Sequence, residues 1–461
     1  MKRIDHPIMT RVSQQARKNS RLGQEASIRW WQLALIGISS VIGAGFFLGS
    51  SLSIHAAGAS VLIGYLISGI TALTVFSSLA EMTVNDPERG SFRTYAKKAY
   101  GSGFAFVFGW IYWFAGLLIV SSEITALATF TRFWFPHVPL WLLCILFAAV
   151  GTGIVLSGVK NFGTIESFFA IIKTSALIAF LLFALIIFLK GSNLPPRLHS
   201  PFQSGLFPNG FFGLWQSLIV TLLSFGGIEI VGLTADRCRT DKEVLQAGFS
   251  MIGVLLAIYL SSLAAILALA KFPQIDPNQS PFVTALAIVR VPYIDSMFNL
   301  IILTAAFSTM LGALYSMTTI LGALADDDAA PRFLKNHKSQ QKRCLAVTFL
   351  LLIVLISSSY FLPKTVYEYL ATAAGTMLLL NWLNILLSNL KNRKNYHGLH
   401  WRLKFQPFFA CFGILIILFS ICGALFNDHQ RVSVLLSVSM LSALSFIYLL
   451  RKKAHGNKEQ I

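Results

Sequence analysis

Three ionisable residues inside long apolar runs are the first candidates for chemistry in this sequence: Glu123, Lys173 and Glu229. A charge at the centre of a membrane helix costs at least ~2.5 kcal/mol, so such residues are functional candidates by default. Lys173 lies eleven residues into its run, too deep for the ammonium to reach water easily. Because burial disfavours a charged lysine, this group can lose and regain a proton. We predict that Lys173 carries a proton; a permanently charged lysine paired with a buried carboxylate is the alternative.

The acidic residues allow more than one role. Glu123 follows Ser122 and either lines a polar path or pairs with another apolar segment. Glu229 lies just after the glycine pair Gly226-Gly227, and this position is equally compatible with a structural anchor and with a gating residue. Glu81 lies near the end of another apolar run, so we expect it to pair with a basic loop residue. The run Asp326-Asp-Asp328 lies beside five basic residues, which favours a solvated ion-pair cluster over a metal site.

Two apolar runs contain glycine-rich breaks near their middle. The first reads Gly37-Ile-Ser-Ser-Val-Ile-Gly-Ala-Gly-Phe-Phe-Leu-Gly49, and the second reads Phe225-Gly-Gly-Ile-Glu229. Glycine-interrupted helices in corresponding positions of two halves are typical of a transporter built from two repeats, with its site at the breaks. The alternative is that small residues merely let helices pack closely.

Free backbone groups at the breaks favour a zwitterionic ligand. A half-helix that starts at Gly43-Ala44-Gly45 presents unpaired N–H groups and a positive dipole end, which suit a carboxylate. Carbonyl groups near Ile42 and Phe225 suit an ammonium group. One amine and one carboxylate a few ångströms apart define an amino acid. The predicted binding residues are Ile42, Gly43, Ala44, Gly45, Ser122, Glu123, Phe225, Gly226, Gly227 and Ile228. Phe225 is also a candidate lid, and Glu229 a candidate gating residue.

The composition indicates that these residues lie in a membrane. Only 12% of the 461 residues are charged and the mean hydropathy is +0.67, whereas ordinary globular domains carry about 25% charged residues. Apolar runs of about 20 residues are long enough to cross a bilayer as helices. We predict an all-α polytopic membrane protein with twelve transmembrane helices. The predicted spans are 31–53, 60–83, 104–132, 138–157, 163–189, 212–235, 244–270, 296–325, 344–361, 365–389, 406–426 and 432–450.

The loop charges predict the orientation of these spans. With the N-terminus inside, 29 of the 37 Lys and Arg residues lie in inside segments and 7 lie outside. Excess cations mark the cytoplasmic side, so both termini should be cytoplasmic. The net charge of +18 is therefore attributed to topology and to anionic lipid, and no nucleic-acid partner is expected. We expect a basic tail over 1–29, one membrane domain over 30–450 and a second tail over 451–461.

Other function classes receive little support. The five cysteines show no paired spacing, and no P-loop, GxGxxG, HExxH or GxSxG motif is present. We therefore predict that the protein is not an enzyme and needs no cofactor or metal. A nutrient sensor with a transporter fold would be expected to have a long soluble extension, which tails of about 29 and 11 residues do not provide.

Several motifs together resemble the amino-acid permeases of the amino acid–polyamine–organocation superfamily, in particular its bacterial amino acid transporter branch. Beside the two breaks and Lys173, the matching pieces are Pro87-Glu-Arg-Gly-Ser-Phe92 with Tyr95, Gly109-Trp-Ile-Tyr-Trp113, Glu123-Ile-Thr-Ala126, Leu303-Thr-Ala-Ala-Phe-Ser308, Leu314-Tyr-Ser316 and Ala325-Asp-Asp-Asp-Ala-Ala-Pro331. The resemblance covers about residues 30–390.

The resemblance implies an inverted five-plus-five helix repeat with broken helices 1 and 6. The two repeats would be 30–190 and 212–389, with peripheral helices over 406–450. In relatives the lysine matching Lys173 takes the place of a sodium ion between the first and eighth helices, which implies proton coupling. A serine or threonine of the eighth helix faces that lysine, which nominates Ser308 first and Thr309 second.

Departures from the usual pattern bear on the substrate. Ser39 and Ser40 stand where the family commonly has glycine, and Ala44 stands where it commonly has threonine. Leu311-Gly312 stands where Asn-Ser is frequent in the family, and Thr319 stands where arginine is frequent. These changes favour an apolar or small neutral side chain. We therefore expect a proton-coupled importer of an amino acid in the cytoplasmic membrane. An exchanger of amino acids or amines without ion coupling is the alternative.

Overall fold

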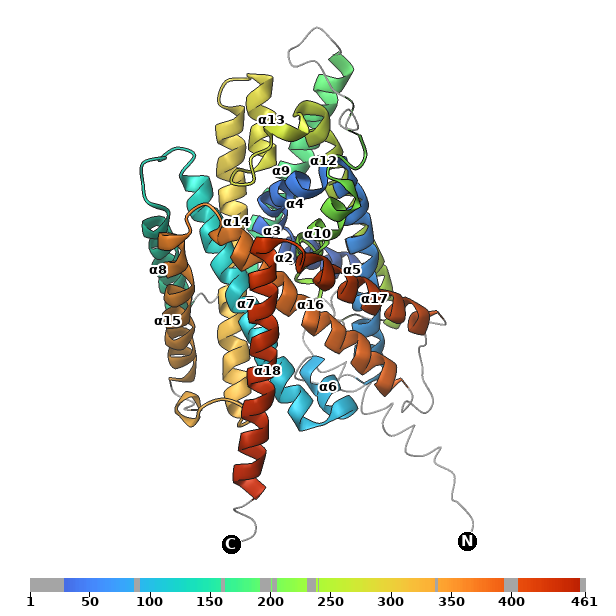
Figure 1. Ribbon diagram of the computed structural model, residues 1–461, viewed down its shortest axis with the longest axis vertical. Helices are drawn as coiled ribbons and strands as arrows, with labels where there is room; N and C mark the ends of the chain where they lie inside the picture. The colour runs from blue at the N-terminus through green and yellow to red at the C-terminus, as the bar shows by residue number, and fades with distance from the viewer. Residues whose placement is uncertain are drawn as a thin grey trace.

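A computed structural model describes residues 29–86, 92–158, 162–190, 200, 205–229, 238, 240–335, 339–393 and 405–456. These residues form helices joined by turns (Figure 1). The described residues leave out 87–91 at the start of the loop motif Pro87–Phe92, 1–28 of the first predicted tail, 457–461 of the second, and 230–235 at the end of the sixth predicted span.

Within these ranges, nine helical segments are long and apolar enough to span a membrane. Three further apolar helices are shorter, namely α2 (Trp30–Val41), α8 (Leu140–Leu156) and α10 (Gly210–Leu223). The first and third of these are short because the breaks interrupt them. The all-helical membrane class is confirmed, whereas the count of twelve spans and the inverted repeat stay predictions.

The helix bounds lie within a few residues of most predicted spans. The other helices before the second break are α3 (Ala44–Phe47), α4 (Gly49–Ala57), α5 (Val61–Asn85), α6 (Phe92–Tyr100), α7 (Ser102–Thr131) and α9 (Phe162–Lys190). Those after it are α12 (Asp241–Leu269), α13 (Pro281–Val289), α14 (Ile294–Asp326), α15 (Gln340–Phe361), α16 (Val366–Asn392), α17 (Gln406–Ala424) and α18 (Asp428–Gly456). Short 3-10 helices lie between these helices at Gly58–Ser60, Phe272–Gln274 and Arg332–Leu334. The span pattern did not predict α6 and α13, which are too short to cross a bilayer.

Both helix breaks occur at the glycines. The first helix stops at Val41, and Ile42 and Gly43 are extended before α3 begins at Ala44. In the second break α10 stops at Leu223, and a turn follows over 224–227, in which Gly227 has φ +106°. Only glycine adopts that conformation without strain.

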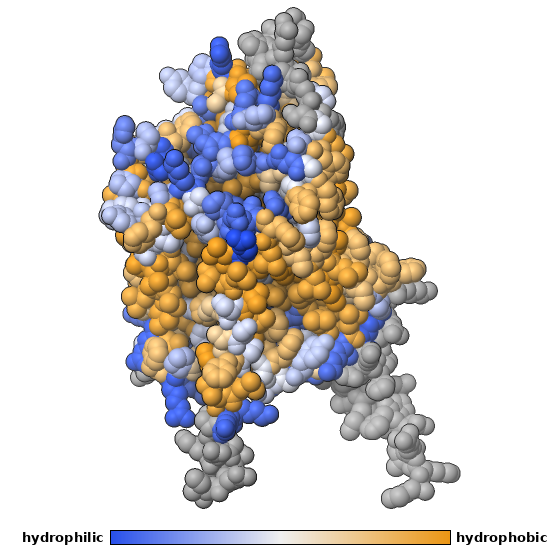
Figure 2. All heavy atoms as spheres, viewed as in Figure 1, coloured by the Kyte–Doolittle hydropathy of each residue, from blue (hydrophilic) through white to orange (hydrophobic). Residues whose placement is uncertain are grey.

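The outer surface fits a bilayer. Apolar side chains form a broad band across the molecule, with hydrophilic residues gathered toward both ends (Figure 2). Helix α17 packs on α5, α10 and α16, while α18 packs on α16 and α7 (Figure 1). Both helices therefore lie at the periphery of the bundle, where many of their apolar side chains are exposed, as expected for lipid contact.

A buried ion pair fixes one end of the bundle. Arg393 Nε lies 3.3 Å from Glu81 Oε1, and the two side chains are 5% and 0% exposed. Nearby, Asn389 donates to the Ser78 carbonyl and Gln406 to the Thr74 carbonyl. The expected pairing of Glu81 with a basic residue is confirmed. The pair joins the end of α5 to the end of α16.

Loss of this pair should destabilise the fold. Removing one partner of a buried ion pair leaves an uncompensated charge, which costs about 3–5 kcal/mol. We expect Arg393→Ala to lower the free energy of unfolding by that order, measured by denaturant unfolding in detergent micelles. The matched control is Arg431→Ala, which removes an exposed pair to Asp428 at 2.9 Å and should change little. Equal effects of the two substitutions would contradict the assignment.

Candidate functional site

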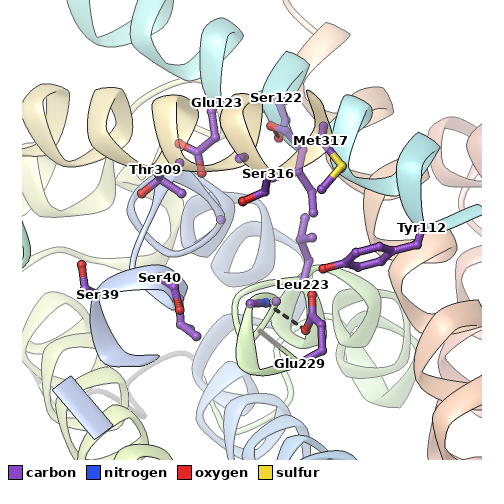
Figure 3. Close-up of a pocket in the computed structure, with 18 of the residues that line it drawn as sticks. Ser39, Ser40, Tyr112, Ser122, Glu123, Leu223, Glu229, Thr309, Ser316 and Met317 are labelled. Carbon is purple, nitrogen blue, oxygen red and sulfur yellow. Dashed lines mark hydrogen bonds between the residues drawn. The ribbon is translucent and has the colours of Figure 1, made fainter. Parts of the chain in front are cut away.

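A cavity of about 180 Å³ lies against both helix breaks. Its walls come from α2, α7, α9, α14 and the turn after α10 (Figure 3). The lining residues are Ile36, Ser39, Ser40, Val41, Gly45, Tyr112, Gly116, Ile119, Ser122, Glu123, Lys173, Leu223, Gly226, Gly227, Glu229, Thr309, Gly312, Ala313, Ser316 and Met317. The mixture of apolar walls and a few buried polar groups is typical of a small-molecule site.

The cavity extends to one side of the breaks. Its α2 residues precede the first break, and Gly226, Gly227 and Glu229 belong to or follow the second. The α7 residues, Tyr112 to Glu123, lie around the middle of that helix, whereas the α14 residues run from Thr309 near its middle to Met317, toward the end where Asp327 pairs with Arg93 of α6. The cavity therefore lies toward the end of the bundle that holds α6 and the last residues of α18, two elements that lie together in Figure 1.

Lys173 ties the first break to α14. Its ammonium donates to the Ser39 carbonyl at 3.2 Å and to the Thr309 hydroxyl at 2.8 Å, and the side chain is only 1% exposed. The Thr309 hydroxyl lies in turn 3.2 Å from the Ile42 carbonyl and 3.1 Å from the Ala305 carbonyl. The ammonium thus secures carbonyl groups that the broken helix leaves without an internal partner.

Glu123 occupies the start of α3. Both of its carboxylate oxygens accept from the Ala44 N–H, at 3.0 and 3.1 Å. A carboxylate is stabilised there by the free amide and by the positive end of the helix dipole. The sequence predicts that this amide binds the carboxylate of a ligand, whereas in the structure its partner is a side chain of the protein.

Space is tight where Glu123 meets the break. A Cβ atom on Gly43 would lie 2.6 Å from Glu123 Oε1 and 2.9 Å from Thr309 Cγ2. Gly43 has φ −149°, a value open to any residue, so close approach rather than backbone conformation requires glycine. At Gly45 the nearest atom to an added Cβ is the Leu223 carbonyl oxygen at 3.7 Å, an ordinary contact.

Glu229 braces the second break. Its Oε2 accepts from the Gly227 N–H at 3.1 Å (Figure 3) and from the Trp382 indole at 3.4 Å. Tyr112 from α7 places its hydroxyl beside the same carboxylate. The carboxylate therefore links the turn to α16 and α7, which fits the anchoring role and leaves gating as a prediction.

Phe225 lies in an aromatic cluster next to the cavity and does not line it. Its ring centroid is 6.3 Å from that of Tyr65 and 5.3 Å from that of Tyr259, and the residue is 0% exposed. Tyr259 also stacks on Phe46 at 3.8 Å. Phe46 follows the first break, whereas the lining residues of α2 precede it, so these rings close the side opposite the cavity.

The structure separates the predicted site residues into two groups. Lining the cavity are Gly45, Ser122, Glu123, Lys173, Gly226, Gly227, Glu229 and Thr309. Buried beside it are Ile42, Gly43, Ala44, Phe225, Ile228 and Ser308. Thr309, the second choice, contacts Lys173; Ser308 points elsewhere because consecutive helical residues face different directions.

Several lining residues are not among those predicted from the sequence. Tyr112, Gly116, Ile119 and Glu123 are spaced i, i+4, i+7 and i+11, which is one face of a helix. On α14 the same periodicity extends from Thr309 through Ser316. Extending each predicted residue along its helix face would have found Tyr112 and Ser316.

Comparison with known proteins assigns the family. Residues 32–460 match the amino acid permease family. The chain is 37% identical over 442 residues to an uncharacterized transporter, YcgH, of Bacillus subtilis, covering 95% of this chain and 97% of the relative. It is 33% identical to the aromatic amino acid transport protein AroP of Escherichia coli K12, covering 78% and 80%. It is 32% identical to the gamma-aminobutyric acid permease of Bacillus subtilis, covering 94% and 95%.

This chain belongs to the amino acid permease family. The resemblance inferred from the breaks, Lys173 and the loop motifs is therefore confirmed. Membership makes the protein a multi-pass membrane transporter for amino acids, and its relatives are transporters rather than enzymes.

The tight contact at Gly43 gives a prediction. Gly43→Ala pushes against Glu123 and Thr309, and overpacking of this kind costs about 1–3 kcal/mol. We expect uptake of a transported amino acid to fall by roughly tenfold or more, since about 1.4 kcal/mol is tenfold in an equilibrium constant. Gly45→Ala is the matched control and should keep most of the uptake. Normal uptake by the Gly43 variant, with similar amounts of folded protein, would contradict the contact.

Proposed function

We propose that this permease imports an amino acid together with a proton, and that Lys173 carries the proton. The observation that supports this most directly is the contact of the Lys173 ammonium with Ser39 and with Thr309, which itself reaches the Ile42 carbonyl. The state of one buried ammonium therefore acts on backbone groups at the first break. Loss of its proton removes the positive charge that attracts these carbonyl oxygens.

The proposed cycle uses this link. With Lys173 protonated, the end of α2 is held against α14 and the site is ordered for substrate. Proton loss on the inside loosens α2 and releases the substrate. Substrate and proton must bind the two states with different affinity, because otherwise neither would shift the population.

The amino-acid backbone is proposed to bind at the breaks. Its carboxylate would take the amides of Gly43, Ala44 and Gly45, which requires Glu123 to leave the Ala44 N–H. Its ammonium would take carbonyl groups near Ile42 and Phe225. A carbonyl oxygen has two lone pairs, so Ile42 can accept from Thr309 and from the substrate together.

We propose a neutral or hydrophobic side chain for the substrate. Ile119, Leu223 and Met317 give the cavity an apolar wall. The Glu229 carboxylate is already engaged by Gly227 and Trp382, so it is a poor partner for a basic substrate. The relatives named for aromatic amino acids and for gamma-aminobutyric acid agree with an uncharged side chain.

The proposal includes the arrangement in the membrane. Repeats over 30–190 and 212–389 would form the transport core in the cytoplasmic membrane, with 406–450 peripheral and both termini cytoplasmic. In that orientation the cavity opens toward the cytoplasm, and the rings around Phe225 close the outer side.

Substitution of Lys173 tests the coupling. The assay is uptake of labelled neutral amino acids into sodium-free proteoliposomes, with and without an inward proton gradient. We expect Lys173→Ala to abolish accumulation above equilibrium, because no group remains to link the proton to α2. Lys364→Ala, a substitution of an exposed loop lysine, should leave accumulation unchanged.

The same vesicles distinguish the alternative function. Uptake by the unmodified protein that requires internal amino acid and ignores the proton gradient would make it an exchanger, with Lys173 a structural cation. Gradient-driven accumulation that persists in Lys173→Ala would remove the proton-carrying role from this residue.

A further inference from the structure

A second, larger hollow lies away from the transport cavity, at the end of the molecule where α6 lies and α18 stops. It has a volume of about 900 Å³ and is bounded by α6, the start of α7, the segment after α14 and the end of α18. Five basic residues line it: Arg93, Lys97, Arg332, Arg451 and Lys452. Asp327 and Asp328 are the acidic residues of its lining.

The carboxylates of the hollow are already neutralised. Arg93 forms an ion pair with Asp327, and Lys335 Nζ lies 2.9 Å from Asp328 Oδ1. The hydrogen bond and charge of Lys335 lower the pKa of Asp328, so this carboxylate stays ionised and paired. Arg451 donates to the Asp328 carbonyl oxygen.

Three cations remain for a ligand. In the described part of the chain, Lys97, Arg332 and Lys452 make no ion pair with the protein. They come from three elements, α6, the turn at Arg332–Leu334 and α18, which meet only in the tertiary structure. Topology alone explains basic residues on this side of the membrane, but not their meeting around one hollow beside two satisfied carboxylates.

Neutral donors complete the hollow. The hydroxyl groups of Ser102 and Tyr448 lie 3.1 Å apart in its wall. Hydroxyl and ammonium groups together suit the oxygens of a phosphate ester, which is an anion with several strong acceptors. The guanidinium of Arg332 adds donors that match phosphate geometry.

The surroundings favour a membrane lipid as the source of the phosphate. On α18, Phe446, Leu449 and Leu450 are 61%, 61% and 54% exposed, immediately before Arg451 and Lys452. The hollow therefore begins where the apolar outer surface of α18 stops. Acyl chains would lie along α18 while the head group enters the hollow.

We propose that this hollow binds the head group of an anionic phospholipid such as phosphatidylglycerol. Bound there, one phosphodiester would bridge α6, the segment after α14 and α18. It would hold together elements that otherwise meet through the pairs at Asp327 and Asp328.

The test compares two double variants of the full chain purified in detergent. Short-chain phosphatidylglycerol and short-chain phosphatidylcholine are titrated separately, and binding is followed by microscale thermophoresis. We expect the unmodified protein to bind phosphatidylglycerol more tightly than phosphatidylcholine. In Lys97→Gln/Lys452→Gln the affinity for phosphatidylglycerol should fall by more than about tenfold, since each cation near a lipid surface contributes roughly fivefold.

The control is Lys342→Gln/Lys453→Gln, which removes the same charge from the same end of the molecule without touching the hollow. It should keep the affinity of the unmodified protein. Equal losses in both variants, or equal binding of the two lipids by the unmodified protein, would overturn the proposal.

Two further arms separate a lipid site from a soluble-anion site and from a loss of folding. Inorganic phosphate and glycerophosphoglycerol, which lack acyl chains, should bind far more weakly than the lipid; equal binding would make this a site for a soluble phosphate compound.

If the double variant unfolds at a lower temperature than the control, Arg332→Gln, an exposed single substitution, takes its place. Unchanged phosphatidylglycerol affinity in that variant would then count against the site.

Discussion

The interruption of the first helix is the constraint on which the rest of the structure depends. Stopping a helix in mid-membrane leaves amide and carbonyl groups without an intrahelical partner, and each group left unpaired is costly. Other parts of the chain therefore supply additional partners. Glu123 of α7 takes the Ala44 amide, Tyr367 of α16 donates to the Ala44 carbonyl at 2.9 Å, and Ser224 of the second break donates to the Gly45 carbonyl at 2.8 Å. The two breaks thus stabilise each other.

This arrangement places a charged side chain at each end of the break. Its amide end is held by a carboxylate, and its carbonyl end by an ammonium through Ser39 and Thr309. A ligand of the same chemistry can displace a side chain from such a site. It cannot displace a backbone partner within a continuous helix. An amino acid carries both an ammonium and a carboxylate, so it matches the two kinds of group that the protein itself places there.

Much of the fold could be predicted because a helix that crosses the hydrocarbon core of a bilayer must be a long apolar run with few charges, and such runs are easily recognised in a sequence. Apart from α10 and the short α13, the helices from α7 to α17 begin and stop within a few residues of the apolar runs, and the glycines mark the breaks. The short helices α6 and α13 are not marked by long apolar runs, since neither has to cross the bilayer. The cavity was predicted in part for the same reason. Glycine breaks and buried charges are conspicuous, whereas Tyr112, Ser316 and Met317 look like ordinary helix residues until the helices are packed.

The sequence by itself determined that this is a helical membrane protein, where its first helix breaks, and which ionisable groups are buried. Only the tertiary structure decided the partners. Adjacent residues on one helix point in different directions, so only packing selects Thr309 over Ser308 for Lys173 and assigns Glu123 to the Ala44 amide. The same reason separates Phe225 from the cavity and gathers Lys97, Arg332 and Lys452 around one hollow. Contacts between residues far apart in the chain depend on how the helices cross, and a single sequence does not encode that crossing in any local pattern.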